Sequence, residues 1–311
     1  MTSGAPSTSP EVPGSGLACS AWARLQNLDP VGTAGSYRGF LLIEWPLPWP
    51  RDLSEDESLA TVLEAARSFG MRLQGLVPAT ESGPRRAIAY RWPPAGGARF
   101  QRSELVVDPG ELVAAAVAVL HQAPLRDEIV DVLVCTHGRR DRCCGSLGTA
   151  LFQELTADPG LLGQGVRVWR TSHTGGHRFA PTAIVLPEGT AWAFCDTAAL
   201  ADIVQQKGAL EDLLPRYRGC SGMATPALQA LERAVLAELG WPLFTMTRYG
   251  VELGGGRTEL VVEGPAGERV VWQGFVRVAR TIPVPDCGQA IEFAAKTEPQ
   301  LVVEGLRSRR G

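Results

Sequence analysis

Side chains that could bind a metal gather in one stretch of the chain, residues 134–187. They are Cys135, Cys143, Cys144, His173 and His177, with His137 among them. The whole chain has 7 cysteines and 4 histidines, so this stretch holds a large share of both residue types. Thiolate and imidazole groups both bind zinc and iron, so the residue types predict a metal centre without selecting the metal.

The spacing of the cysteines favours a metal cluster over a single ion. Structural zinc sites usually place cysteines about two to four residues apart, whereas eight residues separate Cys135 from Cys144. A loop of this length suits a two-iron centre, and Gly138 and Gly145 would let its backbone approach the inorganic sulfides. A structural zinc site with the same ligands is the alternative.

Three other cysteine signatures do not match this stretch. The C-x-H sequence at Cys135 begins like a Rieske motif, but neither later cysteine is followed by a histidine at the required spacing. The phosphatase signature C-x5-R fails because Asp141 stands where the arginine would be. No C-x-x-C dithiol occurs, which disfavours a thioredoxin-type oxidoreductase, although a reactive thiol at Cys143 or Cys144 stays open.

The composition is that of an ordinary soluble protein. The chain has 311 residues, a hydrophobic fraction of 45% and a formal net charge of −3, and its basic residues are scattered. Scattered basic residues disfavour a nucleic-acid partner, and no apolar run approaches the roughly 20 residues that span a membrane. The chain starts without a secretory signal and has an odd number of cysteines, which predicts a cytoplasmic protein with four further thiols that are buried or inert.

The pattern of elements predicts an α/β protein. Residues 1–16 are rich in Ser, Pro, Gly and Thr and are expected to be disordered. Residues 17–125 are expected to form an α/β domain. We predict its strands at about 39–45, 72–77, 86–92 and 100–107, and its helices at about 58–69 and 109–120.

Residues 126–240 are expected to form the domain that carries the metal ligands. The run IVDVLV reads as a central strand buried on both faces, and it delivers Cys135 at its carboxyl end, where α/β folds commonly place their sites. The order that follows is helix, strand, loop, strand, strand and helix, and a last helix ends near Gly240. Residues 241–311 are expected to form a C-terminal β extension, with strands at 259–262 and 270–282.

The motifs CTHGRRDRCCG and SHTGGHRFAPT, followed by IVLPEGTAWAF and DTAALADIVQQ, resemble the sucrase/ferredoxin-like family, which is related to thioredoxin-like [2Fe-2S] ferredoxins. The match covers about residues 130–206, with weaker likeness in the flanks. The resemblance implies a thioredoxin-like ferredoxin domain, preceded by the second α/β unit and followed by a C-terminal β-ribbon.

The resemblance also implies that Cys135, Cys144, His173 and His177 bind a [2Fe-2S] cluster. Only the family spacing selects Cys144 over Cys143. Side chains expected beside such a cluster are His137, Arg139, Arg140, Cys143 and Arg178.

The function implied is electron transfer or redox sensing with an unidentified protein redox partner, rather than turnover of a substrate. Histidine ligation would raise the potential, as it does in Rieske centres relative to plant-type ferredoxins. Arginines on the cysteine loop would stabilise the reduced, anionic state and could dock an acidic partner. A zinc-binding structural protein and a thiol-dependent oxidoreductase are the alternatives, and nothing in the sequence supports sugar hydrolysis.

Overall fold

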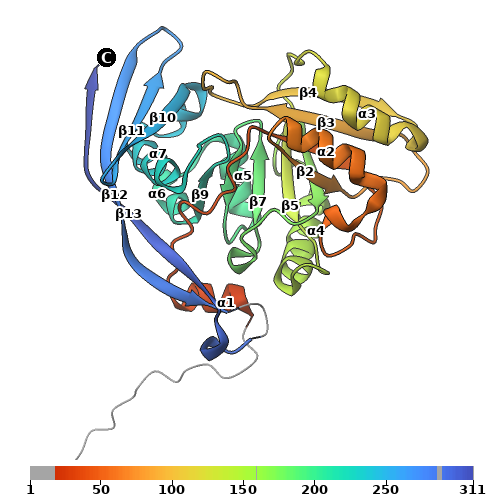
Figure 1. Cartoon of the computed structure of the whole chain (residues 1–311), viewed down its shortest axis with the longest axis horizontal. Helices are drawn as coiled ribbons and strands as arrows, with labels where there is room; N and C mark the ends of the chain where they lie inside the picture. The colour runs from red at the N-terminus through yellow and green to blue at the C-terminus, as the bar shows by residue number, and fades with distance from the viewer. Residues whose placement is uncertain (1–17, 159, 286–288, 311) are drawn as a thin grey trace, which may run out of the picture.

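A computed structural model describes residues 18–158, 160–285 and 289–310, so the predicted disordered segment 1–16 lies outside the described residues. The main element is a nine-stranded mixed sheet with the strand order β4-β3-β1-β2-β6-β5-β7-β8-β9. A separate four-stranded antiparallel sheet, β10-β11-β12-β13, lies at one side of it (Figure 1). The predicted α/β fold class is therefore confirmed.

The first half of the large sheet comes from the N-terminal unit. Its elements are β1 (Gly39–Glu44), α2 (Ala60–Ser68), β2 (Met71–Leu76), β3 (Arg85–Arg91), β4 (Gln101–Val107) and α3 (Leu112–Ala118). Strand β1 is buried at every position, as its continuous apolar sequence requires. It pairs in parallel with β2 and antiparallel with β3, so the local order is β4-β3-β1-β2.

The second half repeats this topology. Its elements are β5 (Val130–Cys135), α4 (Thr149–Ala157), β6 (Val166–Thr171), β7 (Ala183–Leu186), β8 (Thr190–Trp192) and α5 (Thr197–Gln205). Strand β5 pairs in parallel with β6 and antiparallel with β7, which gives the order β6-β5-β7-β8, and β9 (Tyr217–Cys220) extends the edge. The two units are thus topological copies of each other, a relationship that the sequence pattern does not reveal.

The copies join at a short antiparallel seam between β2 and β6, where Leu76 is paired with Thr171. The hydrogen bonds around the seam are nearly symmetric: Ser172 N–H donates to the Gly75 carbonyl at 2.8 Å and Val77 N–H donates to the Arg170 carbonyl at 2.9 Å. The predicted boundary at residues 125/126 falls in the connection between β4 and β5, so both predicted domains contribute to one continuous sheet.

A buried ionic network strengthens the joint. The carboxylate of Asp131, which is fully buried on β5, accepts hydrogen bonds from Tyr90 Oη at 2.6 Å, Arg167 Nε at 2.7 Å and Trp169 Nε1 at 2.6 Å. Tyr90 belongs to β3 of the first unit, whereas Arg167 and Trp169 belong to β6 of the second. Burial, with the nearby Asp131 charge, raises the pKa of Tyr90 well above its usual value, so Tyr90 stays a proton donor.

The C-terminal segment forms a larger sheet than the sequence predicts. It comprises α6 (Leu210–Leu213), α7 (Pro226–Leu239), β10 (Thr247–Gly254), β11 (Arg257–Glu263), β12 (Arg269–Val284) and β13 (Lys296–Arg310). The sequence analysis predicted the strands now labelled β11 and β12 but neither β10 nor β13. Helix α7 contacts all four strands of this sheet and thereby joins it to the rest of the molecule.

The long β12–β13 hairpin reaches away from its sheet to the N-terminal helix α1 (Cys19–Leu25) (Figure 1). Ile282 and Val284 of β12 form an apolar cluster with Ala23 on α1 and with Phe179. The hairpin therefore holds α1 against the second unit. Among the described residues, no helix is long and apolar enough to cross a membrane.

The Asp131 network generates a prediction about stability. Asp131→Ala removes the buried acceptor of the Tyr90 hydroxyl and the Trp169 indole and leaves Arg167 with Glu104 alone. We therefore expect a loss of about 3 kcal/mol in the free energy of unfolding. Urea denaturation of metal-free protein measures this loss. The control is Glu304→Ala, which removes an exposed ion pair with Arg277 and should leave the unfolding midpoint unchanged. Equal midpoints for Asp131→Ala and the wild type would contradict the role given to the network.

Candidate metal centre

The cysteine loop starts where β5 leaves the sheet and returns directly against the same strand end. Cys135 is the last residue of β5, and Cys144 begins a π-helical turn, η5 (Cys144–Gly148), that continues into α4. Both cysteines are fully buried. Turns of this kind are rare and often occur at functional sites.

Glycines allow this close return of the loop. A Cβ on Gly148 would lie 1.9 Å from the carbonyl oxygen of Cys135, and a Cβ on Gly145 would lie 2.5 Å from the Cα of Gly138. Both obstacles are backbone atoms, which cannot move aside as a flexible side chain can. Gly138 and Gly145, which were expected to let the backbone approach inorganic sulfides, therefore pack against each other.

The histidines lie on the loop that follows β6. His173 comes soon after the strand, and His177 begins the short turn η6 (His177–Phe179) after Gly176, which has a φ of 71°. The loop also surrounds a buried guanidinium: Arg218 on β9 donates from Nη1 to the Gly175 carbonyl at 3.2 Å and from Nε to Thr33 Oγ1 at 3.0 Å. Burial, together with the nearby Arg178 charge, lowers the pKa of Arg218 to about 10.

Three of the four predicted ligands meet in what we call the inner group, Cys135, Cys144 and His173. One ligand atom from each of these residues lies within 4.8 Å of the other two. The Nδ1 atom of His173 is buried and has no hydrogen-bond partner. Hydrogen bonding by Cys144, assisted by His173 and opposed by burial, lowers the pKa of the Cys135 thiol well below its usual value. The inner group is thus set to present a thiolate.

The fourth predicted ligand, His177, belongs to a second set that we call the outer group, Cys19, Asp141 and His177. Their ligand atoms also lie within 4.8 Å of one another. His177 Nδ1 is 2.5 Å from Asp141 Oδ2 and 3.5 Å from Cys19 Sγ. The rings of His173 and His177 are 6.3 Å apart between centroids, so the two groups are neighbours. Cys143 lies on the outer side, with its sulfur 3.4 Å from that of Cys19.

His137 holds its neighbours and has no nitrogen left to bind a metal. Its Nδ1 accepts a hydrogen bond from the backbone N–H of His173 at 3.3 Å, so Nε2 carries the proton and donates to the Pro50 carbonyl at 2.9 Å. Trp49 packs edge-on against the ring, and burial lowers the pKa of His137. His137 therefore links the His173 loop to the first unit.

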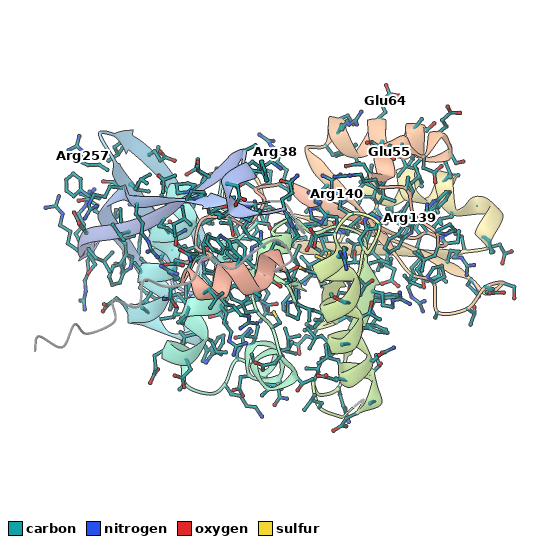
Figure 2. All side chains as sticks on the ribbon, turned by 90° about the horizontal axis from the view of Figure 1, so that it is seen from below. Arg38, Glu55, Glu64, Arg139, Arg140 and Arg257 are labelled. Atoms are coloured by element: carbon teal, nitrogen blue, oxygen red, sulfur yellow. The ribbon has the colours of Figure 1, made fainter. Side chains whose placement is uncertain are left out.

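Two of the arginines predicted to lie beside the site form ion pairs with carboxylates. Arg140 pairs with Asp52 at 3.2 Å, and Arg178 pairs with Glu298 on β13. Figure 2 shows Arg139 and Arg140 at the boundary between α4 and the first unit. The positive charge near the cysteine loop is therefore partly neutralised by carboxylates.

The sequence analysis missed several residues of the site. Cys19 was expected to be an inert thiol; it is buried, as expected, but it lies beside His177, and Cys287 lies outside the described residues. Asp141 was noted only because it is not an arginine. No local signal marks Cys19 or Arg218, because long-range packing alone brings them to the loop.

The donor atoms of the inner group are of the kinds that bind either an iron-sulfur cluster or a zinc ion. Two thiols and a half-buried imidazole with an unpartnered nitrogen converge, which is a donor set that both metals accept. His177 lies on the adjoining side, where it could complete the set. The short separations within the inner group also suit a single ion.

One comparison with known proteins gives a match. The sequence model of the family described as sucrase/ferredoxin-like matches residues 30–219, which is more than half of the chain. The chain therefore belongs to this family. The matched residues include the inner group and all of the large sheet except the last residue of β9, and they exclude α1, α7 and the C-terminal sheet. No curated protein and no solved structure matches the chain.

The close return of the cysteine loop yields a second prediction. Gly148→Ala forces its methyl group against the Cys135 carbonyl, and we expect it to cost about 2 kcal/mol of stability and to separate Cys135 from Cys144. Urea denaturation and the rate of thiol modification at these cysteines measure both effects. Gly110→Ala, where no atom lies within 4 Å of the added carbon, is the matched control and should behave as wild type. An unchanged thiol reactivity in Gly148→Ala would contradict the prediction.

Proposed function

We propose that this member of the sucrase/ferredoxin-like family is an electron-transfer or redox-sensing protein that binds a [2Fe-2S] cluster through Cys135, Cys144, His173 and His177. The observation that carries the proposal is the convergence of the inner group at the end of β5, with a depressed thiol pKa at Cys135 and an unpartnered imidazole nitrogen at His173. Family membership supports it, since the family description includes a ferredoxin-like relationship.

The chain's own residues fix what such a site could do. A bound cluster would supply one-electron chemistry, and two neutral imidazoles in place of two thiolates would raise its potential. Arg218, buried behind the histidine loop, adds positive charge that would favour the more negative, reduced state. Arg72 of the first unit and His137 of the cysteine loop hold His173 in place, because Arg72 donates to the His173 carbonyl and His137 accepts from its N–H.

The histidine side is the natural side for electron exchange. Both cysteines of the inner group are fully buried, whereas His173 is half-buried and the side chain of His177 is 18% exposed. A hollow of about 50 Å³ reaches His173 and is bordered by Arg51, Arg72 and His137. A protein redox partner that meets this surface would come closer to the imidazoles than to the thiolates.

A structural zinc site is the second candidate, and one observation favours it. The three inner ligand atoms lie within 4.8 Å of one another, a separation that suits one ion as well as a larger centre. A thiol-dependent oxidoreductase acting through Cys143 or Cys144 receives less support. Both side chains are buried, which denies a disulfide substrate access, and hydrogen bonding to Cys135, together with burial, raises the pKa of Cys144.

The adjacent cysteines provide a matched test of the ligand set. Purified without oxygen, wild-type protein should contain two iron atoms and two sulfides per chain and show visible bands that bleach with dithionite. Cys144→Ser should lose the iron and the colour, because it removes an inner ligand. Cys143→Ser changes the neighbouring residue in the same way and should keep both. A colourless wild type with one zinc ion per chain, even after reconstitution with iron and sulfide, would overturn the proposal in favour of zinc.

Replacing a histidine by cysteine tests the ligands on the other side. His177→Cys should keep the cluster, shift its visible bands and lower its midpoint potential toward the roughly −400 mV of plant-type ferredoxins, because a thiolate adds negative charge. Redox titration followed by absorbance gives the potential. His121→Ala changes a histidine that contacts Phe69 in the first unit and should leave the potential unchanged. An unchanged spectrum and potential in His177→Cys would exclude His177 as a ligand.

A further inference from the structure

The outer group lies on residues that the family match only partly includes. Cys19 belongs to α1, which precedes the matched residues 30–219, whereas Asp141 comes from the cysteine loop and His177 from the histidine loop. Three separate segments therefore bring one thiol, one carboxylate and one imidazole together, each with a ligand atom within 4.8 Å of the others. Cys19 and Asp141 are 2% and 6% exposed, so the cluster of polar groups is enclosed by protein.

The separations suit a mononuclear tetrahedral ion. Zinc bonds of about 2.3 Å to sulfur and 2.0 Å to nitrogen place a thiolate and an imidazole about 3.5 Å apart and two thiolates about 3.8 Å apart. Cys19 Sγ is 3.5 Å from His177 Nδ1 and 3.4 Å from Cys143 Sγ. Asp141 Oδ2, 2.5 Å from the same nitrogen, would move outward by less than an ångström to share an ion.

We propose that the chain has a second metal site, in which Cys19, Asp141 and His177 bind a zinc-class divalent cation beside the Cys143 thiol. Mixed sulfur, nitrogen and oxygen donors select a borderline ion such as Zn²⁺ over Mg²⁺ or Ca²⁺, which prefer oxygen ligands alone. The site is distinct from the proposed cluster set in two of its three residues. It shares His177 with that set, so the two metals compete for one imidazole.

The site would also fasten the N-terminal helix. Helix α1 spans only seven residues and is held mainly by contacts with η6 and with Ile282 and Val284 of β12. An ion bound to Cys19 ties α1 covalently, through metal-ligand bonds, to both ligand loops. A bound ion would therefore stabilise the folded position of α1, and without the ion the helix would be held only by its remaining contacts.

Cobalt binding in a chain without the inner thiols tests this site. The chain carries Cys135→Ser and Cys144→Ser. Circular dichroism first checks that it is folded, and it is then titrated anaerobically with Co²⁺ alone. We expect one ion per chain, with the intense visible bands of tetrahedral cobalt and a thiolate charge-transfer band. Loss of a hydrogen bond to a metal ligand lowers metal affinity roughly 10- to 100-fold. Adding Cys19→Ser removes a ligand itself, so it should lower the cobalt affinity by more than this. Adding Cys195→Ser, another buried thiol, should change nothing.

Two further measurements keep the test decisive. Asp141→Asn in the same background retains every remaining thiol and should also weaken cobalt binding. If the background does not fold, Cys19→Ser and Cys195→Ser are compared in the wild-type chain, titrated with Co²⁺ in buffer free of iron and sulfide. Only Cys19→Ser should lower the number of cobalt ions bound per chain by one. Undiminished cobalt affinity in both Cys19→Ser and Asp141→Asn would overturn the second site.

The outcome is separable from that of the proposed function. Cys19→Ser in the otherwise unchanged chain should assemble the full complement of iron and sulfide, because Cys19 is outside the cluster set. Cobalt binding that depends on Cys19 in a protein that never assembles a cluster would support the second site and reject the proposed cluster. The reverse result would reject the second site alone.

Discussion

The pairing of β2 with β6 is the contact on which the site depends. Each of these strands is the edge strand of a four-stranded unit, and their antiparallel pairing at Leu76 and Thr171 makes a single sheet from two topological copies. Because β5 runs parallel to β6, with Cys135 opposite Thr171, the seam lies beside the end of the strand that carries Cys135. The carboxyl ends of strands from both copies thus meet where the cysteine and histidine loops begin.

The two copies have divided their roles. In the first unit Glu44 occupies the position that Cys135 occupies in the second, since Glu44 is opposite Leu76 in the β1–β2 pair. Glu44 is almost fully buried and accepts a hydrogen bond from the backbone N–H of Arg86, so this strand end stabilises its own sheet. The first unit instead covers both loops of the site: its Pro50 carbonyl accepts from His137 of the cysteine loop, and its Arg72 guanidinium donates to the His173 carbonyl of the histidine loop. The first unit therefore lines one side of the site and contributes no residue to the inner group.

Elements with a clear local sequence pattern were predicted correctly. Elements that depend on contacts with distant parts of the chain were missed. The apolar run of β5 predicted a buried strand ending at Cys135, and the strand does end there, because burial on both faces leaves a clear hydrophobic signature. Strand β13 was missed because most of its residues are exposed and polar, so it has little apolar pattern of its own and is held by pairing with β12. Cys19 was not recognised as part of the site, since a seven-residue helix has little periodicity and its place depends on a hairpin about 260 residues later in the chain.

His177 is the residue at which the two metal proposals meet. Its Nδ1 atom contacts Asp141 and Cys19, whereas its ring lies 6.3 Å from that of His173, so one imidazole adjoins both groups. If the outer group binds His177 through Nδ1, only Nε2 of the same ring is left for another metal. If the His177 ring turns toward the inner group instead, it loses its contact with the Asp141 carboxylate. Because Asp141 is buried, losing that partner leaves its carboxylate with backbone N–H donors such as that of Cys143, unless a cation replaces the imidazole. If both proposed metals bind, the occupancy of one group would change the free energy of binding at the other through this shared imidazole.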